Sequence, residues 1–311
     1  MTFSYKIKEE ISKLECSRLE KISELSGILN TTADIKMYCI RIQTENINAA
    51  NRIFKTVKEL YDVTANITIR KNYNFKKNEI YIIEIKRNVL TIIKDLGLIR
   101  EGKMELSLVP NESIVSDEEL KSAFIRGCFL ICGSVNDPKT SRYHLEFLIQ
   151  NVEFANFLCN LLNEYNLNAK VLRRKKGYMV YIKESEKISD LLKLIKAYDG
   201  VMYYENIRSY REKINMTNRL NNCEQANTFK SMKSAQDQIK EIEYIKEKGA
   251  YDILDEKVKE VCEYRLKYPE SSLMELSEII SIETKNKITK SCLNHRLRKI
   301  KDLATTLRNK Q

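Results

Sequence analysis

The sequence predicts an α+β protein in which two tandem αββαββα repeats precede an all-α C-terminal domain. Three observations support this prediction. A pattern of apolar helix, strand, helix and hairpin occurs twice, at a spacing of about one hundred residues. Only 3 Pro and 8 Gly are present, which favours a helix-rich chain without long flexible linkers. The net charge of the chain reverses sharply near its C-terminus.

Each repeat begins with an apolar helix that contains a glycine, Gly27 in the first repeat and Gly127 in the second. Glycine costs a helix interior ~1 kcal/mol relative to alanine, so a glycine in both helices indicates a packing requirement. Ser116 and Glu119 have the spacing of a capping box and predict the start of the second helix.

The elements after these two helices follow the same order. After Gly27 we expect a strand-like segment at residues 35–44, a helix at 48–61, and a hairpin of strands 66–71 and 80–86. After Gly127 the corresponding segments are 143–150, 152–165, 170–174 and 178–183. The sequence therefore predicts two copies of one structural unit.

The tips of both predicted hairpins are basic. Their charged residues are Arg70, Lys71, Lys76 and Lys77 in the first hairpin and Arg173, Arg174, Lys175 and Lys176 in the second. A lone basic hairpin is usually a solvated turn, whereas two at equivalent repeat positions also fit a shared electropositive face. Both interpretations stay open, and the hairpins are a candidate second DNA surface.

The charge reversal separates two segments of the C-terminal part. Residues 251–280 carry a net charge of −4, and residues 281–311 carry +7. Such a reversal favours one element that faces a polyanion. Asp255 can cap a helix that runs to about Lys267, and Ser272 with Glu275 forms a capping box for a short helix that runs to about Ile280.

A third helix is predicted over residues 289–307, where apolar residues at helical spacing form one side and polar, cationic residues the other. Three helices with a basic last helix are typical of a helix-turn-helix domain, and Asn and Arg can make bidentate contacts to adenine and guanine. We predict DNA contacts by Lys290, Ser291, Asn294, His295, Arg296, Arg298, Lys299 and Lys301. A frayed, solvated basic tail is the alternative, and the apolar periodicity argues against it.

Residues 201–226 are predicted to form a linker helix. Asn215, Asn218 and Asn222 recur there at helical spacing, with Arg219 between them. This polar stripe either contacts the DNA backbone or another domain, or it is a solvated face. A separate amphipathic helix is expected at residues 236–245.

Composition narrows the class of protein. A net charge of +11 favours an anionic partner, either nucleic acid or a membrane surface. No apolar run approaches the ~20 residues that span a bilayer, and the N-terminal segment has no secretory character, so we expect a cytoplasmic protein. The 8 Cys include no Cys-x-x-Cys pair and only 2 His are present, so neither a metal site nor a cofactor is expected.

A helix with an internal small residue, followed by strand, helix and hairpin, twice over, resembles the LAGLIDADG homing-endonuclease fold. The resemblance implies that the two motif helices pack backbone to backbone and that the sheets form a saddle over DNA. It places Thr32 and Cys132 where active members carry acidic metal ligands. Neither residue is a suitable Mg²⁺ ligand, and Asp34 and Asp137 lie further along the chain.

Four stretches resemble the WhiA family of sporulation and cell-division regulators: residues 3–10, 126–135, 218–227 and 293–299. The last two, NRLNNCEQAN and LNHRLRK, are the most specific. The stretches run along the whole chain in family order. The resemblance implies a degenerate LAGLIDADG body without nuclease activity, joined to a C-terminal helix-turn-helix domain. Where glycine is expected after the first motif helix, the chain reads Asn-Thr-Thr-Ala, which leaves that local turn open.

We therefore expect a first LAGLIDADG-like repeat at residues 1–105, a second at 106–200, the linker helix at 201–226 and the helix-turn-helix domain at 227–311. The expected function is sequence-specific regulation of transcription in sporulation, or in cell division and chromosome segregation. The expected partner is double-stranded DNA in the nucleoid, bound by a monomer, and other transcription or division proteins are candidate partners. An active LAGLIDADG-type endonuclease and a nucleoid-associated interaction module remain the alternatives.

Overall fold

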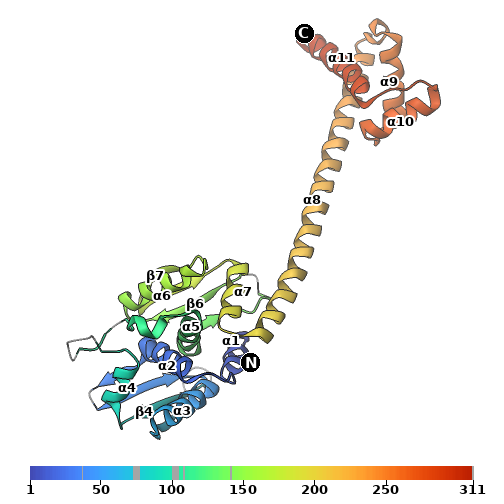
Figure 1. The fold of residues 1–311 in the computed structure, drawn as a ribbon. Helices are drawn as coiled ribbons and strands as arrows, with labels where there is room; N and C mark the ends of the chain where they lie inside the picture. The colour runs from blue at the N-terminus through green and yellow to red at the C-terminus, as the bar shows by residue number, and fades with distance from the viewer. Residues whose placement is uncertain (37, 73–77, 100–104, 108, 141, 310–311) are drawn as a thin grey trace. The chain divides into compact units, whose positions relative to one another are not determined.

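The computed structural model describes residues 1–36, 38–72, 78–99, 105–107, 109–140 and 142–309. The chain divides into two compact units, Met1–Arg211 and Glu212–Gln311. The first unit contains both predicted repeats, and the second contains the C-terminal helices (Figure 1).

The first repeat has the predicted αββαββα order. Its elements are α2 (Arg18–Thr32), β1 (Asp34–Lys36), β2 (Cys39–Thr44), α3 (Ile47–Tyr61), β3 (Asn66–Asn72), β4 (Asn78–Ile85) and α4 (Val89–Asp95). The strands form one antiparallel sheet in the order β1-β2-β4-β3. Along β2, Ile40 and Ile42 are buried and Arg41 and Gln43 are exposed, so one face of this sheet covers the core. The single segment expected at residues 35–44 is two strands.

The second repeat reproduces this arrangement. Its elements are α5 (Glu118–Cys132), β5 (Gly133–Val135), β6 (Leu145–Ile149), α6 (Val152–Glu164), β7 (Lys170–Arg174), β8 (Gly177–Ile182) and α7 (Ser185–Leu194). Their sheet has the order β5-β6-β8-β7, again antiparallel throughout. The predicted fold class is therefore confirmed. A short 3-10 helix, η1 (Glu112–Val115), precedes α5.

The start of α5 differs from the prediction. Asp117, and not Ser116, is the N-cap residue, and its carboxylate accepts a hydrogen bond from the backbone N–H of Leu120 at 2.9 Å. Asp and Ser are both good N-cap residues, so two adjacent candidates could not be separated by propensity alone. The predicted capping box of Ser116 and Glu119 is wrong.

The helices α2 and α5 pack backbone to backbone, side by side between the two sheets (Figure 1). A Cβ atom on Gly127 would lie 2.1 Å from the carbonyl oxygen of Glu24. A Cβ atom on Gly27 would lie 2.3 Å from the carbonyl oxygen of Phe124. Gly127 thus faces the residue three positions before Gly27, and Gly27 faces the residue three positions before Gly127. This reciprocal contact is a two-fold relationship between the repeats. Only glycine permits this approach.

A buried ionic network joins the repeats beside this contact. Glu24 is 2% exposed and pairs with Arg126, which is fully buried, at 2.7 Å. Its other carboxylate oxygen pairs with Arg52 of α3. Both guanidinium groups also donate to Cys16 Sγ, at 3.1 Å from Arg126 and 3.2 Å from Arg52. The single carboxylate pairs with both cations, the buried Arg126 and the partly buried Arg52, and without it their desolvation would be uncompensated.

The helix α1 (Phe3–Ile11) packs on unit 1 together with the first turns of α8 (Tyr198–Glu247). The ring of Phe3 lies 5.3 Å from the ring of Tyr203 and 6.3 Å from that of the buried Tyr204. The residues around 201–211 therefore belong to unit 1 and not to a free linker. Among the described residues, no helix combines the length and the apolar character that a bilayer crossing requires.

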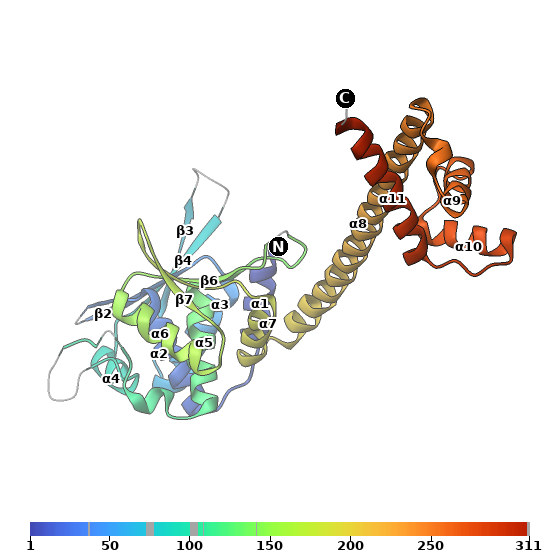
Figure 2. The same ribbon diagram turned by 90° about the horizontal axis from the view of Figure 1, so that it is seen from above.

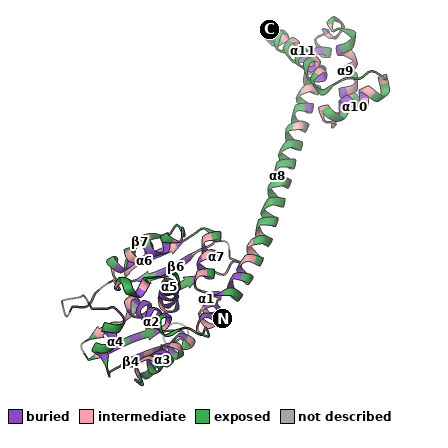
Figure 3. Ribbon diagram, viewed as in Figure 1, coloured by how far each residue is buried: buried purple, intermediate pink, exposed green. Residues whose placement is uncertain are grey.

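One continuous helix replaces the predicted linker at 201–226 and the separate helix at 236–245. α8 has 50 residues, and neither glycine nor proline occurs between Gly200 and Gly249 to interrupt it. The helix ends where Gly249 adopts a φ of +66° and Ala250 N–H donates to the carbonyl of Ile245. All residues from 212 to 230 are exposed, as the burial colouring of Figure 3 shows along the middle of α8.

Unit 2 packs the end of α8 against η2 (Tyr251–Ile253), α9 (Glu256–Lys267), α10 (Leu273–Thr284) and α11 (Lys290–Asn309). Its core is a single cluster that includes Ile242, Ile245, Val261, Leu276, Ile280, Leu293 and Ile300. The capping box of Ser272 and Glu275 is present and starts α10 as predicted.

Candidate nucleic-acid interface

The basic helix α11 is anchored at its start and along one face. Thr289 Oγ1 accepts a hydrogen bond from Cys292 N–H at 3.3 Å, and its carbonyl accepts one from Leu293 N–H at 3.0 Å. Leu293, Leu297 and Ile300 point into the core and are at most 4% exposed. This packing decides which side of the helix remains free.

The free side carries most of the predicted DNA contacts. The exposed residues among them are Lys290, Ser291, Asn294, His295, Arg298, Lys299 and Lys301. Among the described residues, no hydrogen bond or ion pair engages the side chains of Asn294 and Arg298. Both side chains are therefore available to an external partner with matching donors and acceptors. Lys299 lies 3.9 Å from Asp255 but is itself 53% exposed, so screening weakens that pair.

Arg296 is placed differently from the other predicted contacts. Its Nη1 donates to the carbonyl of Lys257 at 3.1 Å and lies 3.6 Å from a carboxylate oxygen of Glu260. The side chain is only 16% exposed. Arg296 thus ties α11 to α9 within the domain, because its position on the helix directs it toward α9 and away from the free side.

The turn before α11 is shorter than predicted. α10 continues to Thr284, and Lys285 then adopts a left-handed φ of 55°, so the connection spans residues 285–289. Ser281 Oγ donates to the carbonyl of Ser277 at 2.6 Å and accepts from the N–H of Ile288 at 3.0 Å. This hydroxyl links the turn to α10. The shorter connection is closer to the turn of an ordinary helix-turn-helix domain.

The corner between α9 and α10 is held by Arg265, which the sequence analysis did not identify. Arg265 is 1% exposed and donates to the carbonyl of Ser271 at 2.6 Å. Burial lowers the pKa of this guanidinium. The only sequence signal was an arginine among the apolar positions of α9, where a buried cation is not the default expectation.

The hairpin tips in unit 1 are exposed at Arg70, Lys71, Arg173, Arg174, Lys175 and Lys176. Lys76 and Lys77 lie outside the described residues. The second hairpin closes with a two-residue turn before Gly177, whose φ is +120°. Figure 2 shows the β3–β4 and β7–β8 hairpins projecting from the same side of unit 1. Arg219 is exposed on the middle of α8.

Within the part of the chain that the structure describes, the ends of the motif helices carry no cluster of carboxylates that could hold a metal ion. Cys132 Sγ donates to the carbonyl of Cys128 at 3.2 Å, and burial raises the pKa of the Cys132 thiol to about 12. Thr32 is the last residue of α2. Asp34 begins β1 and is exposed, 3.7 Å from Lys36. Asp137 accepts from the backbone N–H of Lys139 at 2.9 Å, so neither aspartate stands at a helix end.

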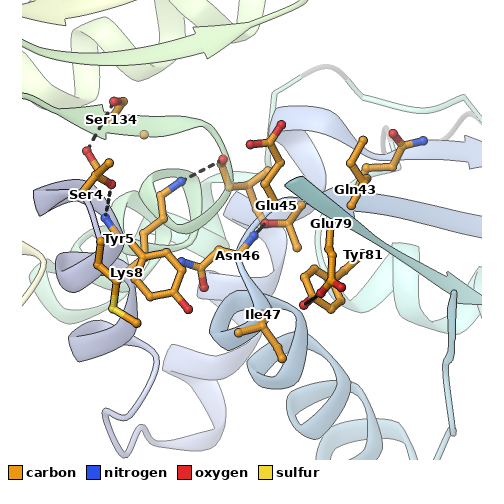
Figure 4. Close-up of a pocket in the computed structure, with 16 residues that line it drawn as sticks. Ser4, Tyr5, Lys8, Gln43, Glu45, Asn46, Ile47, Glu79, Tyr81 and Ser134 are labelled. Carbon is orange, nitrogen blue, oxygen red and sulfur yellow. Dashed lines mark hydrogen bonds between the residues drawn. The ribbon is translucent and has the colours of Figure 1, made fainter. Parts of the chain in front are cut away.

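An ammonium group stands at the end of α5. Lys8 of α1 donates to the carbonyl of Ile131 at 3.2 Å, and burial lowers the pKa of Lys8 to about 8, although Cys132 and Glu45 act in the opposite direction. Figure 4 shows Lys8 extending across a pocket toward this carbonyl. The cation complements the negative end of the helix dipole, and repulsion between cations disfavours a divalent metal beside it.

That pocket lies within unit 1 and has a volume of about 850 Å³. It is lined by residues of α1, the β2–α3 junction, β4 and the α5–β5 junction, including Tyr5, Glu45, Asn46 and Tyr81 (Figure 4). Among the described residues, His, Cys, Asp and Glu side chains nowhere gather in a group of three that could hold a metal ion. The pocket therefore offers hydrogen-bonding groups, the ammonium group of Lys8 and the carboxylates of Glu45 and Glu79.

Three family models together match most of the chain. The WhiA N-terminal LAGLIDADG-like domain matches residues 18–99. The WhiA LAGLIDADG-like domain matches residues 121–214, which include α5 from Lys121 onward and the first turns of α8. The WhiA C-terminal HTH domain matches residues 217–304, which include α11 up to Ala304.

Curated relatives and solved structures agree with these matches. The chain is 38% identical over 313 aligned residues to the probable cell division protein WhiA of Staphylococcus aureus (strain JH9), covering 99% of this chain and 98% of the relative. It is similar to the crystal structure of full-length DUF199/WhiA from Thermatoga maritima, with a TM-score of 0.61, 27% identity and coverage of 98% and 99%. The N-terminal LAGLIDADG domain of DUF199/WhiA matches with a TM-score of 0.52 and 28% identity, over 62% of this chain and 90% of that one. The chain, with its paired LAGLIDADG-like repeats and its helix-turn-helix domain, belongs to the WhiA family.

Proposed function

We propose that this protein is a sequence-specific DNA-binding transcription regulator that acts in the nucleoid and has no nuclease activity. The observation that carries the proposal is the free side of α11. There Asn294 and Arg298 have no partner among the described residues and stand beside the cations Lys290, Lys299 and Lys301. The amide and guanidinium groups can read base edges, and the lysines can neutralise phosphates. The regulated process is cell division and chromosome segregation or sporulation, and of these, cell division is in keeping with the name of the Staphylococcus aureus relative.

A second DNA contact is proposed for the basic hairpins of unit 1 and for Arg219 on α8. Support comes from the exposure of Arg70, Lys71, Arg173, Arg174, Lys175 and Lys176 and from the common side of unit 1 on which the two hairpins lie (Figure 2). Contacts of this kind go to phosphates and position the protein without reading sequence. Binding as a monomer fits this scheme, because the internal repeat already supplies two related halves.

Salt dependence tests the electrostatic part of the proposal. Replacing Lys290 or Lys301 with alanine removes one cation from the free side of α11 and is expected to lower the slope of log K against log salt concentration by about 1 each. Fluorescence anisotropy on a fixed duplex measures this change in slope, at salt concentrations from about 50 to about 200 mM. Lys58→Ala on the exposed side of α3 is the matched control. Affinity that is indifferent to salt would contradict the proposal.

Incubation of the pure protein with supercoiled plasmid and Mg²⁺ or Mn²⁺ is expected to give no nicked or linear product. Cys132 remains a protonated thiol because its pKa is raised, and Lys8 disfavours a metal at the end of α5. The measurement is gel electrophoresis after prolonged incubation, with an active homing endonuclease as the positive control. Cleavage that disappears in the variant Asp34→Asn with Asp137→Asn would restore the endonuclease interpretation.

A further inference from the structure

A shallow groove of about 460 Å³ lies on the outer side of α10 in unit 2. Its lining combines carboxylates with aliphatic side chains: Glu270, Ser271, Glu275, Glu278, Ile279 and Ile282. All of the lining residues except Ile282 belong to the acidic segment 251–280 that precedes the basic helix, and the proposed DNA contacts do not use the groove.

The aliphatic side chains make this groove unlike a solvated helix face. Ile282 is 78% exposed and Met274 is 61% exposed, whereas Leu276 and Ile280 on the opposite side of α10 are fully buried. α10 therefore has a second apolar side that the domain itself does not cover. Ile282 and the partly exposed Ile279 line the groove, and Met274 is a further exposed apolar side chain of the same twelve-residue helix.

The acidic side chains of the groove determine which kind of molecule can bind there. Among the described residues, no hydrogen bond or ion pair engages Glu270 or Glu278. The carboxylate of Glu275 accepts from the N–H of Ser272 at 2.7 Å, which holds it at the start of the groove. Phosphates would be repelled by three carboxylates, so DNA does not cover this surface. Charge complementarity requires a partner that is basic beside its apolar residues.

We propose that this groove docks a basic, amphipathic segment of a partner protein. Aliphatic side chains of the segment contact Ile279 and Ile282, and its Lys or Arg residues meet Glu270 and Glu278. Such a helix-in-groove arrangement uses anchors at one-turn spacing, which matches the separation of the two isoleucines. The inference goes beyond DNA binding, because it gives the same domain a protein contact through a surface of opposite charge.

Site-specific photocrosslinking of the full-length protein in its native host tests this proposal. A benzophenone amino acid at position 282 is expected to form a discrete adduct with one protein, whose crosslinked peptide carries net positive charge and aliphatic residues. The same amino acid at position 253 is the matched control, because Ile253 is 77% exposed but lies outside the groove. Adducts with DNA, adducts with a second copy of this chain, or the absence of an adduct specific to position 282 would overturn the proposal.

A charge-reversal variant provides the second test of the docking proposal. The variant Glu270→Lys with Glu278→Lys is expected to reduce the position-282 adduct at least tenfold, while duplex affinity is retained or increased. Glu247→Lys with Glu263→Lys adds the same charge at exposed positions outside the groove and is expected to leave the adduct unchanged. A synthetic peptide of the crosslinked segment should bind the wild type and lose binding when its own Lys and Arg are replaced by Glu. An adduct insensitive to the groove charges would contradict the docking model, and retained duplex affinity distinguishes that failure from a failure of the DNA-binding proposal.

Discussion

Replacing Asn294 and Arg298 with alanine is expected to weaken binding to the specific DNA site by ~1–3 kcal/mol for each lost base contact, or about five- to 150-fold in Kd. Both side chains stand on the free side of α11 without internal partners among the described residues, so their removal leaves no buried group uncompensated. The stability of the domain should therefore be unchanged while recognition is lost. Each single variant should show part of the effect.

The measurement compares a duplex selected by the wild-type protein from a random pool with a scrambled duplex. Loss of base contacts lowers the affinity ratio between the two, whereas loss of phosphate contacts lowers both affinities together. Asn160→Ala and Arg142→Ala, both exposed in unit 1, are the matched controls. An unchanged affinity ratio for the double variant would show that α11 is not the recognition helix.

Gly127→Ala is expected to lower the free energy of unfolding of unit 1 by about 3 kcal/mol, the upper end of the usual range for overpacking. The new Cβ would lie 2.1 Å from the carbonyl oxygen of Glu24 and 2.9 Å from its carbonyl carbon. These are backbone atoms of α2, which cannot rotate away as a side chain can. The two helices must separate, which also strains the ion pair between Glu24 and Arg126. A loss of this size is a large fraction of the stability of a typical domain.

The sign of this effect is informative, because helix propensity alone predicts the opposite result. Alanine favours a helix interior over glycine by ~1 kcal/mol. Urea unfolding of the full chain, with hydrogen exchange by mass spectrometry to follow residues 118–132, measures the change in unit 1. Asn156→Ala on the exposed side of α6 is the control and should change stability by no more than ~0.5 kcal/mol. A variant Gly127→Ala as stable as the wild type would be incompatible with the close backbone contact.

The order of elements could be predicted because it depends on local patterns. The spacing of Gly27 and Gly127, the strand alternation and the helical periodicity of residues 289–307 are each visible within a few turns of chain. The capping box of Ser272 and Glu275 was predictable for the same reason, since both partners lie within one helical turn. Where two cap residues were adjacent, as at Ser116 and Asp117, local pattern was insufficient.

The contacts that sequence reasoning missed join residues far apart in the chain. Glu24 pairs with Arg52, 28 residues away, and with Arg126, 102 residues away. Lys8 reaches the carbonyl of Ile131 across 123 residues. No periodicity or spacing rule connects such positions, because their proximity results from the packing of the two repeats on one another.

The sequence by itself determined that this chain has two related αββαββα halves, a basic final helix and motif-helix ends without acidic residues, because repeats, amphipathic periodicity and residue identity are local properties. Only the tertiary structure decided which charged side chains remain available. It turned Arg296 toward Glu260, it left the side chains of Asn294 and Arg298 without a partner among the described residues, and it left Ile282 of α10 exposed. The physical reason is that burial and pairing depend on what the neighbouring helices place opposite each side chain, and those neighbours are set by the fold.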